Sequence, residues 1–574
     1  MAAAFRAARS LAVAAVAAGF VHAALAQQQP QQQSPQPDSG TPPPAAPTAG
    51  GSAGGQAWRP FPTMQVTAPV STAAAAAPPE TAPPAFQSAL SAEVKESWTD
   101  NVALTSTHQR HDEISSISPA INLSARGYST DLEVGYNGGY DRYVNNTEFD
   151  SFQHNGVATL ASSWLDQRAT FTAQGSVSEP NINPTSAVAG GNRANPVNRL
   201  RNLSYNAGPK FQEPLGDFAV VSVSGTHSQT VNERINSVET AQNTPAAAPA
   251  IGDTTENRAH AEAHGGIEFS RLLWDLTSDV SRSRLSTGAL AQQSDQLATE
   301  YKVTRDFGVL IGGGYDYFHG LGVSASNNGG SYYGGVHWTP SPNTDLRIGG
   351  GWREGKPYFF GLLNEQLGPY TNLRISRDTK ITSDSLNTFD TLESLVRSID
   401  GSTFVDPLTG LAASPGSTAF QQSNSVYRLS TTQAVLTRTE DRDSLSLTVL
   451  VSSQDVLSNQ QSNLSVFTGA PLAQANTTVT GNLQWTHQLS RVLTASLSGG
   501  INAIVASSLP TGKTKRAQAT ADLAYTLSDK TTLEAQYFFS DALVPSGSNI
   551  VSAFGSTSGR IKEDLVFVAL KRKF

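Results

Sequence analysis

A hairpin of two alternating strands stands out over residues 476–502. Apolar side chains such as Leu483 and Trp485 alternate with small polar ones, and after residues 489–492 the alternation resumes around Leu497. Side chains along a strand point to opposite faces with a period of two, so each strand has one apolar face and one polar face. Because only a few residues join them, the two strands are predicted to pair antiparallel.

The same alternation recurs along most of the chain and is interrupted by two kinds of connection. Clusters of Asp, Asn, Gly, Pro, Ser and Arg predict short turns. These turns are predicted near residues 126–129, 165–168, 213–217, 270–271, 305–306, 340–343, 377–378, 440–443, 490–491 and 528–530. Long segments rich in Asn, Ser, Gly, Pro and Thr predict loops. The loops are predicted over residues 179–200, 230–256, 387–424, 454–473 and 542–558.

Short turns and long loops alternate, as periplasmic turns and outward loops do in bacterial outer-membrane barrels. About ten short turns predict about 22 strands, counting a first strand near residues 92–104 and a last one that ends at Phe574. Weak segments give a range of about 18 to about 24 strands. The predicted fold is therefore all-β: a large antiparallel up-and-down transmembrane β-barrel with a disordered N-terminal segment.

A membrane barrel is favoured over a soluble sandwich or propeller. The polar partners in each strand are mostly Thr, Ser, Asn, Gln and Gly, as expected of a wet lumen. A soluble β protein of this size needs two packed inner faces or a regular blade repeat, and no repeat of blade length is visible. Trp164, Trp338 and Trp485 each precede a predicted short turn, which is typical of an aromatic girdle at a membrane interface.

The first part of the chain has a different composition from the rest. A basic start and an apolar segment ending in small residues predict a secretory signal peptide over residues 1–26, with cleavage between Ala26 and Gln27. Residues 27–88, rich in Gln, Pro and Ala, predict a disordered periplasmic segment because they have few large apolar groups to bury. The barrel is assigned to residues 89–574. It holds no run of about 18 apolar residues, so no transmembrane helix is predicted.

The end of the chain carries a further signal. Val566, Val568 and Leu570 share one face of a predicted final strand, and Phe574 is the last residue. This pattern resembles the recognition signal of the outer-membrane assembly machinery, except at Arg572, where an apolar or aromatic residue is usual. The assembly machinery and outer-membrane lipid are therefore predicted partners.

Composition argues against several kinds of chemistry. The sequence has no cysteine, which removes disulfides, thiolate metal sites and cysteine nucleophiles. The net charge is −8 and the Lys and Arg residues are scattered, so no nucleic-acid partner is predicted. The run Gly312-Gly313-Gly314 neither opens a helix nor carries the Lys of a phosphate loop. It is interpreted as a place where a barrel strand bends or clears the lumen.

His260 and His264 lie four residues apart in a predicted strand, and no matching Cys or carboxylate cluster follows them. We interpret them as structural or solvated histidines. The sequence thus predicts no catalytic, cofactor-binding or metal-binding residues, and no enzyme. Polar residues of the hairpin are predicted to face the lumen. They are Thr480, Asn482, Gln484, Thr494, Ser496 and Ser498.

Several segments resemble those of a known family. They are Trp98-Thr99-Asp100-Asn101, Ser118-Pro119, residues 132–140, residues 373–382 and the loop residues 406–410. In these segments the chain is similar to the outer-membrane β-barrel proteins associated with exopolysaccharide loci and the PEP-CTERM sorting system. The resemblance spans most of residues 90–574. It implies an outer-membrane barrel linked to polysaccharide secretion in a Gram-negative bacterium, and it supplies no catalytic residues.

The leading hypothesis is a porin-like conduit linked to exopolysaccharide export, with polysaccharide and periplasmic export components as further partners. Hydroxyl and amide side chains on the lumen face would hydrogen-bond sugar hydroxyls or water. A receptor of the TonB-dependent kind fits about 22 strands, but it needs a folded plug that residues 27–88 do not supply. A plug-less receptor or a structural anchor is therefore the alternative. An outer-membrane enzyme requires a nucleophile and a base that the sequence does not show.

Overall fold

The computed structural model describes residues 85–574, with gaps. The residues left out within this range are 105, 108, 180–199, 235–252, 267, 286–287, 321–322, 324–327, 395, 398–403, 406–425, 458–475, 508–514, 545–550, 553–554 and 557–558. The predicted signal peptide, its cleavage site at Ala26 and Gln27, and most of the predicted periplasmic segment lie outside the described residues.

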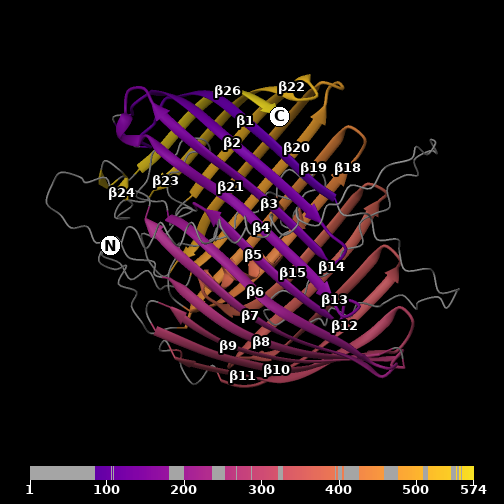
Figure 1. Ribbon diagram of the computed structural model, residues 1–574. Coiled ribbons are helices and arrows are strands. Elements are labelled where there is room, and N and C mark those ends of the chain that lie inside the picture. Colours follow the sequence, from indigo (N-terminus) through magenta and orange to yellow (C-terminus); the bar gives the residue numbers. More distant parts are fainter. Residues whose placement is uncertain are drawn as a thin grey trace, which may run out of the picture. The chain divides into compact units, whose positions relative to one another are not determined.

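A single sheet of 22 strands contains most of the described chain. Its strands are β1 (Ala85–Thr99), β2 (Asp112–Arg126), β3 (Thr130–Tyr143), β4 (Ser151–Trp164), β5 (Ala169–Ser178), β6 (Leu200–Leu215), β7 (Ala219–Arg234), β8 (Thr254–Gly265), β9 (Leu272–Leu285), β10 (Gly288–Lys302), β11 (Phe307–Gly320), β12 (Gly329–Ser341), β13 (Thr344–Arg353), β14 (Lys356–Gly368), β15 (Thr371–Thr382), β18 (Tyr427–Thr439), β19 (Asp443–Val456), β20 (Asn476–Gln488), β21 (Leu493–Ser507), β22 (Lys515–Ser528), β23 (Thr531–Val544) and β26 (Gly559–Lys573). Figure 1 shows these strands inclined across the barrel wall.

The remaining elements are small. They are the 3-10 helix η1 (Thr147–Phe149), the α-helix α2 (Asp384–Ser394), and two short strand pairs, β16 (Val396–Arg397) with β17 (Phe404–Val405) and β24 (Val551–Ser552) with β25 (Gly555–Ser556). Among the described residues, no helix is both long and apolar enough to cross a bilayer.

The sheet closes on itself. β1 pairs antiparallel with β2 along one edge and with β26 along the other, where Trp98 faces Val566. Every other strand of the sheet likewise pairs antiparallel with the strand before it and the strand after it. Closure leaves no edge strand with unpaired backbone groups. The prediction of a closed antiparallel barrel of about 22 strands is confirmed.

Two details of the predicted strand layout are wrong. β1 begins at Ala85 and ends at Thr99, so it lies earlier than the strand predicted over residues 92–104. The turn predicted at residues 377–378 lies inside β15, and Pro369-Tyr370 forms the turn between β14 and β15. Consecutive residues of a strand point to opposite faces, so only Asp378 shares the inner face with Lys380, and the charged pair is accommodated within the strand.

Short connections are not confined to one rim of the barrel. β13 and β14 are joined by Glu354-Gly355 at the rim where the predicted long loops lie. Both residues have positive φ, 53° and 74°, which is what a tight two-residue hairpin turn requires. Glycine adopts this conformation freely, whereas Glu354 is strained by its β-carbon. We call the two ends of the barrel the short-turn rim and the long-loop rim.

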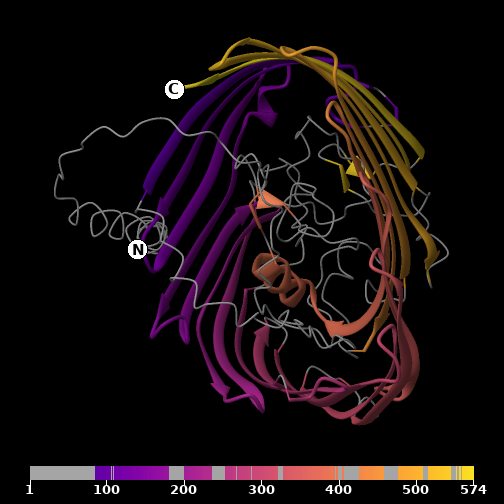
Figure 2. The same ribbon diagram turned by 90° about the vertical axis from the view of Figure 1, so that its right-hand side faces the viewer.

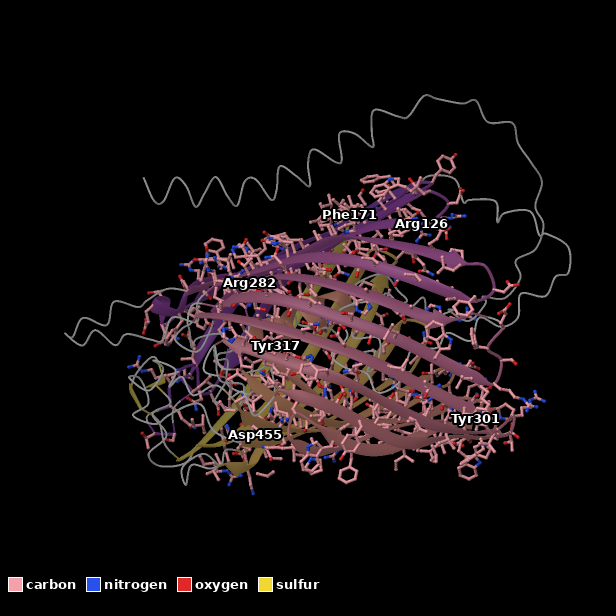
Figure 3. The ribbon with its side chains drawn as sticks, turned by 90° about the horizontal axis from the view of Figure 1, so that it is seen from below. Arg126, Phe171, Arg282, Tyr301, Tyr317 and Asp455 are labelled. Carbon is pink, nitrogen blue, oxygen red and sulfur yellow. The ribbon has the colours of Figure 1, made fainter. Side chains whose placement is uncertain are left out.

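The outer surface carries an apolar belt bounded by aromatic side chains. Exposed aliphatic residues of the belt include Leu90, Val94, Val223, Leu276, Leu297, Ile311, Ile348, Leu483, Leu497 and Leu523. Exposed aromatic residues at the short-turn rim include Tyr128, Trp164, Phe218, Tyr301, Trp338, Tyr370, Trp485 and Tyr525. A second exposed set lies nearer the long-loop rim and includes Tyr136, Tyr205, Tyr315, Tyr332, Phe359 and Tyr537. Figure 3 places Tyr301 toward one end of the barrel and Tyr317 toward the other.

Glycines on β11, β12 and β13 make room for aromatic rings on the inner face. Leu310, Tyr333, Tyr358 and Phe360 form a buried cluster there. A β-carbon on Gly349 would lie 2.3 Å from Cζ of Phe360 and 2.5 Å from a backbone oxygen of the neighbouring strand. The glycines therefore serve close packing of rings against the wall.

Replacing Gly349 by alanine is expected to lower the free energy of unfolding by about 1–3 kcal/mol, because the added methyl group overpacks this cluster. Urea unfolding of the refolded barrel, followed by tryptophan fluorescence, measures the change. Gly361→Ala is the matched control, since the nearest atom to its added β-carbon would lie 3.8 Å away, an ordinary contact. Equal stability of the two variants would contradict the packing role.

Candidate functional site

Helix α2 lies inside the ring of strands (Figure 2). It follows β15 directly, and Ser383 caps it, with the Ser383 Oγ accepting a hydrogen bond from the Leu386 backbone N–H at 3.3 Å. This is the arrangement expected of a serine at a helix N-cap. Leu386, Phe389 and Leu392 are buried, and the helix contacts β5 and β6, which lie far from β15 around the barrel. The segment after β15 thus crosses the lumen to reach another part of the wall.

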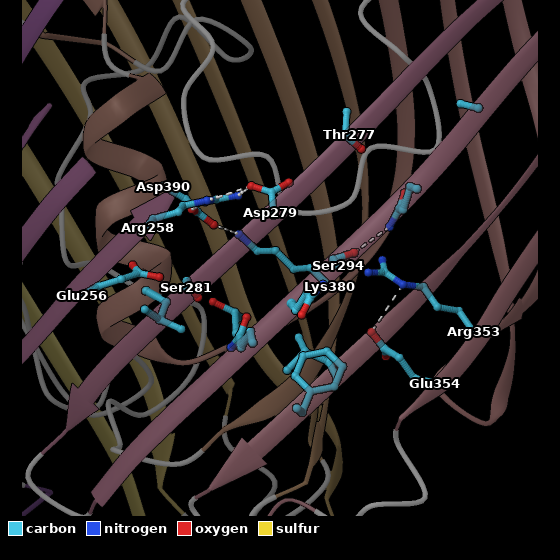
Figure 4. Close-up of a pocket in the computed structure, with 18 of the residues that line it drawn as sticks. Glu256, Arg258, Thr277, Asp279, Ser281, Ser294, Arg353, Glu354, Lys380 and Asp390 are labelled. Carbon is cyan, nitrogen blue, oxygen red and sulfur yellow. Dashed lines mark hydrogen bonds and ion pairs between the residues drawn. The ribbon is translucent and has the colours of Figure 1, made fainter. Parts of the chain in front are cut away.

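Asp390 fastens α2 to two further strands. Its Oδ2 accepts a hydrogen bond of 2.6 Å from the Lys380 ammonium of β15, and its Oδ1 lies 4.0 Å from Nη1 of Arg258 on β8. Arg258 in turn donates to Asp279 of β9 at 2.8 Å and 3.0 Å. Figure 4 shows Asp390 next to Arg258 and Lys380. We call these four residues the helix anchor.

A second charged group lies where β14 and β15 separate near the long-loop rim. The pairing of these strands starts at Gly361 and Arg377, although β14 begins at Lys356 and β15 runs on to Thr382. The tight turn at Glu354 stands beside this separation, and charged side chains connect β13 and this turn to β11 and β18.

Four almost fully buried residues make these connections, and we call them the hairpin cluster: Asp316, Arg353, Glu354 and Arg428. Arg353 donates from Nε and Nη2 to the two carboxylate oxygens of Asp316, each at 2.9 Å. Arg428 donates from Nε to a carboxylate oxygen of Glu354 and from Nη2 to its carbonyl oxygen, also at 2.9 Å. Arg353 Nε lies 3.5 Å from Glu354 Oε1, which joins the two pairs. These contacts hold Glu354 in its strained conformation.

Two cavities meet at the hairpin cluster. The first has a volume of about 100 Å³, is lined by residues of the helix anchor and by Arg353 and Glu354, and has room for several water molecules. The second has a volume of about 240 Å³ and is lined by Arg353, Glu354 and Arg428, with residues of β14, β15, β18 and β19. The site can therefore hold polar groups and water between paired charges of both signs.

The six residues predicted to face the lumen lie on one side of the sheet. Thr480, Asn482 and Gln484 alternate on β20 with the exposed Leu483 and Trp485. On β21, the other three alternate with the exposed Leu497, and the register places Gln484 opposite Ser498. They are Thr494, Ser496 and Ser498. The structure thus brings the two sets together, and their contact with a solute stays a prediction.

The residues of the proposed assembly signal lie on β26 and at its end. Val566, Val568 and Leu570 are exposed on its outer face, and Phe574 follows the strand. The Arg572 guanidinium carbon lies 5.7 Å from the centre of the Phe574 ring, a cation–π distance. Reading of this pattern by the assembly machinery stays a prediction.

Sequence reasoning missed α2 and both charged groups. The helix did leave a signal, because Ser383 is followed by apolar residues at intervals of three, Leu386, Phe389 and Leu392, within a polar segment. The predicted loop over residues 387–424 therefore begins inside a helix, and its later part lies largely outside the described residues. The ion pairs had no comparable signal, since strand register and the position of α2, and not sequence spacing, bring their members together.

No family model matches the chain, and no curated protein matches it in sequence. Among solved structures, it is similar to the FrpB iron transporter of Neisseria meningitidis, with 9% identity, a TM-score of 0.48, and coverage of 85% of this chain and 81% of that one. It is also similar to the ferric enterobactin receptor of Pseudomonas aeruginosa, with 12% identity, a TM-score of 0.45, and coverage of 85% and 80%.

A third similar structure is the siderophore receptor PiuA of Acinetobacter baumannii, with 10% identity, a TM-score of 0.45, and coverage of 85% of this chain and 82% of that one. At these identities and TM-scores, the likeness has no bearing on what this chain binds. The resemblance to proteins of exopolysaccharide loci stays a prediction.

Proposed function

We propose that this chain is an outer-membrane β-barrel of a Gram-negative bacterium that acts as a porin-like conduit for a polar solute. The observation that carries the proposal is the two-sidedness of the wall. Its outer face has an apolar belt between two aromatic sets, and its inner face carries hydroxyl, amide and paired charged groups. A lipid bilayer solvates such a belt, whereas in water it would form a large exposed apolar patch.

The solute class follows from the inner face of β20 and β21. Thr480, Asn482 and Gln484 on β20 lie on the same side of the sheet as Ser496 and Ser498 on β21, and none of these side chains carries a charge. Such groups exchange hydrogen bonds with sugar hydroxyls as readily as with water. A nascent exopolysaccharide is therefore the proposed cargo, with periplasmic export components as partners, in line with the family resemblance.

Helix α2 acts as the constriction of this conduit. It is fixed at three places on the wall: by the chain at β15, by its contacts with β5 and β6, and by Asp390 with Arg258. Its removal would widen the passage without breaking any backbone pairing of the sheet.

Single-channel recording of the refolded barrel in a planar bilayer tests the proposal, with neutral oligosaccharides added as blockers. We expect stable currents that sugars interrupt, and a several-fold larger current after deletion of residues 384–394. Asp390→Ala is expected to change the current in the same direction but less, because it releases only the helix anchor. Asp131→Ala is the control, since its ion pair with Arg126 is exposed and lies at the short-turn rim.

A barrel that carries no current, even without residues 384–394, would overturn the conduit. That result would favour a structural anchor. The second candidate is a plug-less receptor, which the anchored helix favours, because a receptor needs a closed lumen. In that case the unmodified barrel passes no current, and the barrel without α2 does.

A further inference from the structure

We propose that the inner wall of β8 and β9 holds a binding site for a divalent transition-metal ion. Glu262, His264 and Asp275 each offer one ligand atom, and these atoms all lie within 4.8 Å of one another. One imidazole with two carboxylates is a donor set that suits borderline divalent ions such as Zn²⁺ and Ni²⁺.

The strand geometry brings these residues together. Glu262 and His264 are two residues apart on β8 and therefore share a face. The register pairs His264 with Asp275 of β9, so the third ligand stands directly across the hairpin. His264 Nδ1 lies 3.7 Å from Glu262 Oε1, a separation that small rotations of these two side chains can close around an ion.

His260 supplies a second imidazole on the same face of β8. Its Nδ1 hydrogen-bonds Asp279 of β9 at 3.1 Å, and its Nε2 lies 3.8 Å from Glu262 Oε2. A histidine that ligates a metal through one ring nitrogen is commonly oriented by a carboxylate on the other. Asp279 holds Nδ1 of His260 in this way, and the ion pair with Arg258 balances the negative charge of Asp279.

Burial of Asp275 is the independent observation that points to a cation. The residue is 4% exposed, and its carboxylate lies within 4.8 Å of the Glu262 carboxylate, so two acidic groups share this place with the single imidazole of His264. A buried carboxylate is costly unless a positive charge or donors compensate it. Asp275 also lines the cavity beside the helix anchor, which gives an ion a path to the site.

The site lies near the short-turn rim, because β8 ends at Gly265 and β9 begins at Leu272. In bacterial outer-membrane barrels the short turns face the periplasm. A bound ion would therefore join two neighbouring strands at the periplasmic end of the lumen. The inference does not depend on which solute the barrel passes.

Isothermal titration of the refolded full-length barrel, purified without a histidine tag, tests the site with ZnCl₂ and NiCl₂. We expect one ion per chain, and the d–d absorption of bound Co²⁺ should show nitrogen and oxygen ligation. Asp275→Asn and His264→Gln are expected to weaken binding at least about tenfold. Asp279→Asn should weaken it less than either ligand variant, because Asp279 orients His260, which lies beside the three ligands and is not one of them.

The control is His227→Ala, which removes an exposed histidine on the adjacent strand β7 and should leave binding unchanged. The heat-dependent mobility of folded barrels in detergent gels shows that each variant is folded. Absence of a bound ion in the unmodified barrel would overturn the site. Binding that survives in both folded ligand variants would also overturn it, since the ion would then sit elsewhere.

Discussion

Replacing Arg353 by methionine is expected to lower the free energy of unfolding by about 3–5 kcal/mol, the cost of leaving a buried charge without its partner. Arg353 donates two parallel hydrogen bonds to Asp316, which is fully buried. In the variant, the Ser294 hydroxyl, at 2.7 Å, would be the one side-chain donor left to the Asp316 carboxylate among the described residues. Urea unfolding of the barrel in lipid vesicles measures the loss.

Two further variants distinguish the cost of the unpaired Asp316 charge from the cost of losing the Arg353 side chain. Arg126→Met breaks an ion pair of 3.3 Å whose members are 61% and 57% exposed, and it should cost only about 0–1 kcal/mol. The double variant Arg353→Met with Asp316→Leu should recover most of the lost stability, because it removes both charges. A double variant no more stable than Arg353→Met would show that packing, and not the stranded charge, sets the effect.

Replacing Ile311 by arginine is expected to lower the free energy of unfolding in lipid by about 2–4 kcal/mol, the cost of a charge at the bilayer midplane on the outside of a barrel. Ile311 is 60% exposed and lies midway along β11, between the exposed Phe307 near the short-turn rim and Tyr315 of the second aromatic set. Unfolding from vesicles, compared with unfolding from detergent micelles, isolates the contribution of the bilayer.

Val303→Arg is the control for the depth of the added charge in the bilayer. Val303 is 54% exposed but lies in the turn after β10, at the short-turn rim, where an arginine should cost only about 0–1 kcal/mol. Ile311→Ala separates the lost apolar contact from the added charge. Equal costs for Ile311→Arg and Val303→Arg would count against a bilayer around this belt, and with it against the proposed location.

The strands could be predicted because a barrel imposes a period of two on the sequence. The hairpin around Leu483 and Leu497 shows this, since both apolar faces lie on the outside and the predicted polar face on the other side. The pattern weakens where both faces are apolar. On β26, Leu565 and Phe567 are buried on the inner face while Val566 is exposed on the outer face, so the final strand shows no alternation of polarity.

The candidate sites could not be predicted, because register decides them. Asp275 meets His264 only because the turn between β8 and β9 sets that pairing, and a shift by one residue would move Asp275 to the other face. The same holds for Arg353 and Asp316, which lie on strands that are not neighbours. Glu262 shares a face with both histidines because i, i+2 and i+4 lie on one side of a strand, whereas the position of Asp275 depends on register.

The pairing of β1 with β26, which closes the barrel, has a consequence for how the chain folds. It pairs Trp98 with Val566, residues from opposite ends of the chain, so loop-closure entropy makes this the slowest pairing to form. Until it forms, both terminal strands expose unpaired edges, which invite association with other chains. The unjoined chain therefore exposes two open sheet edges at once, and a single pairing, that of β1 with β26, covers both.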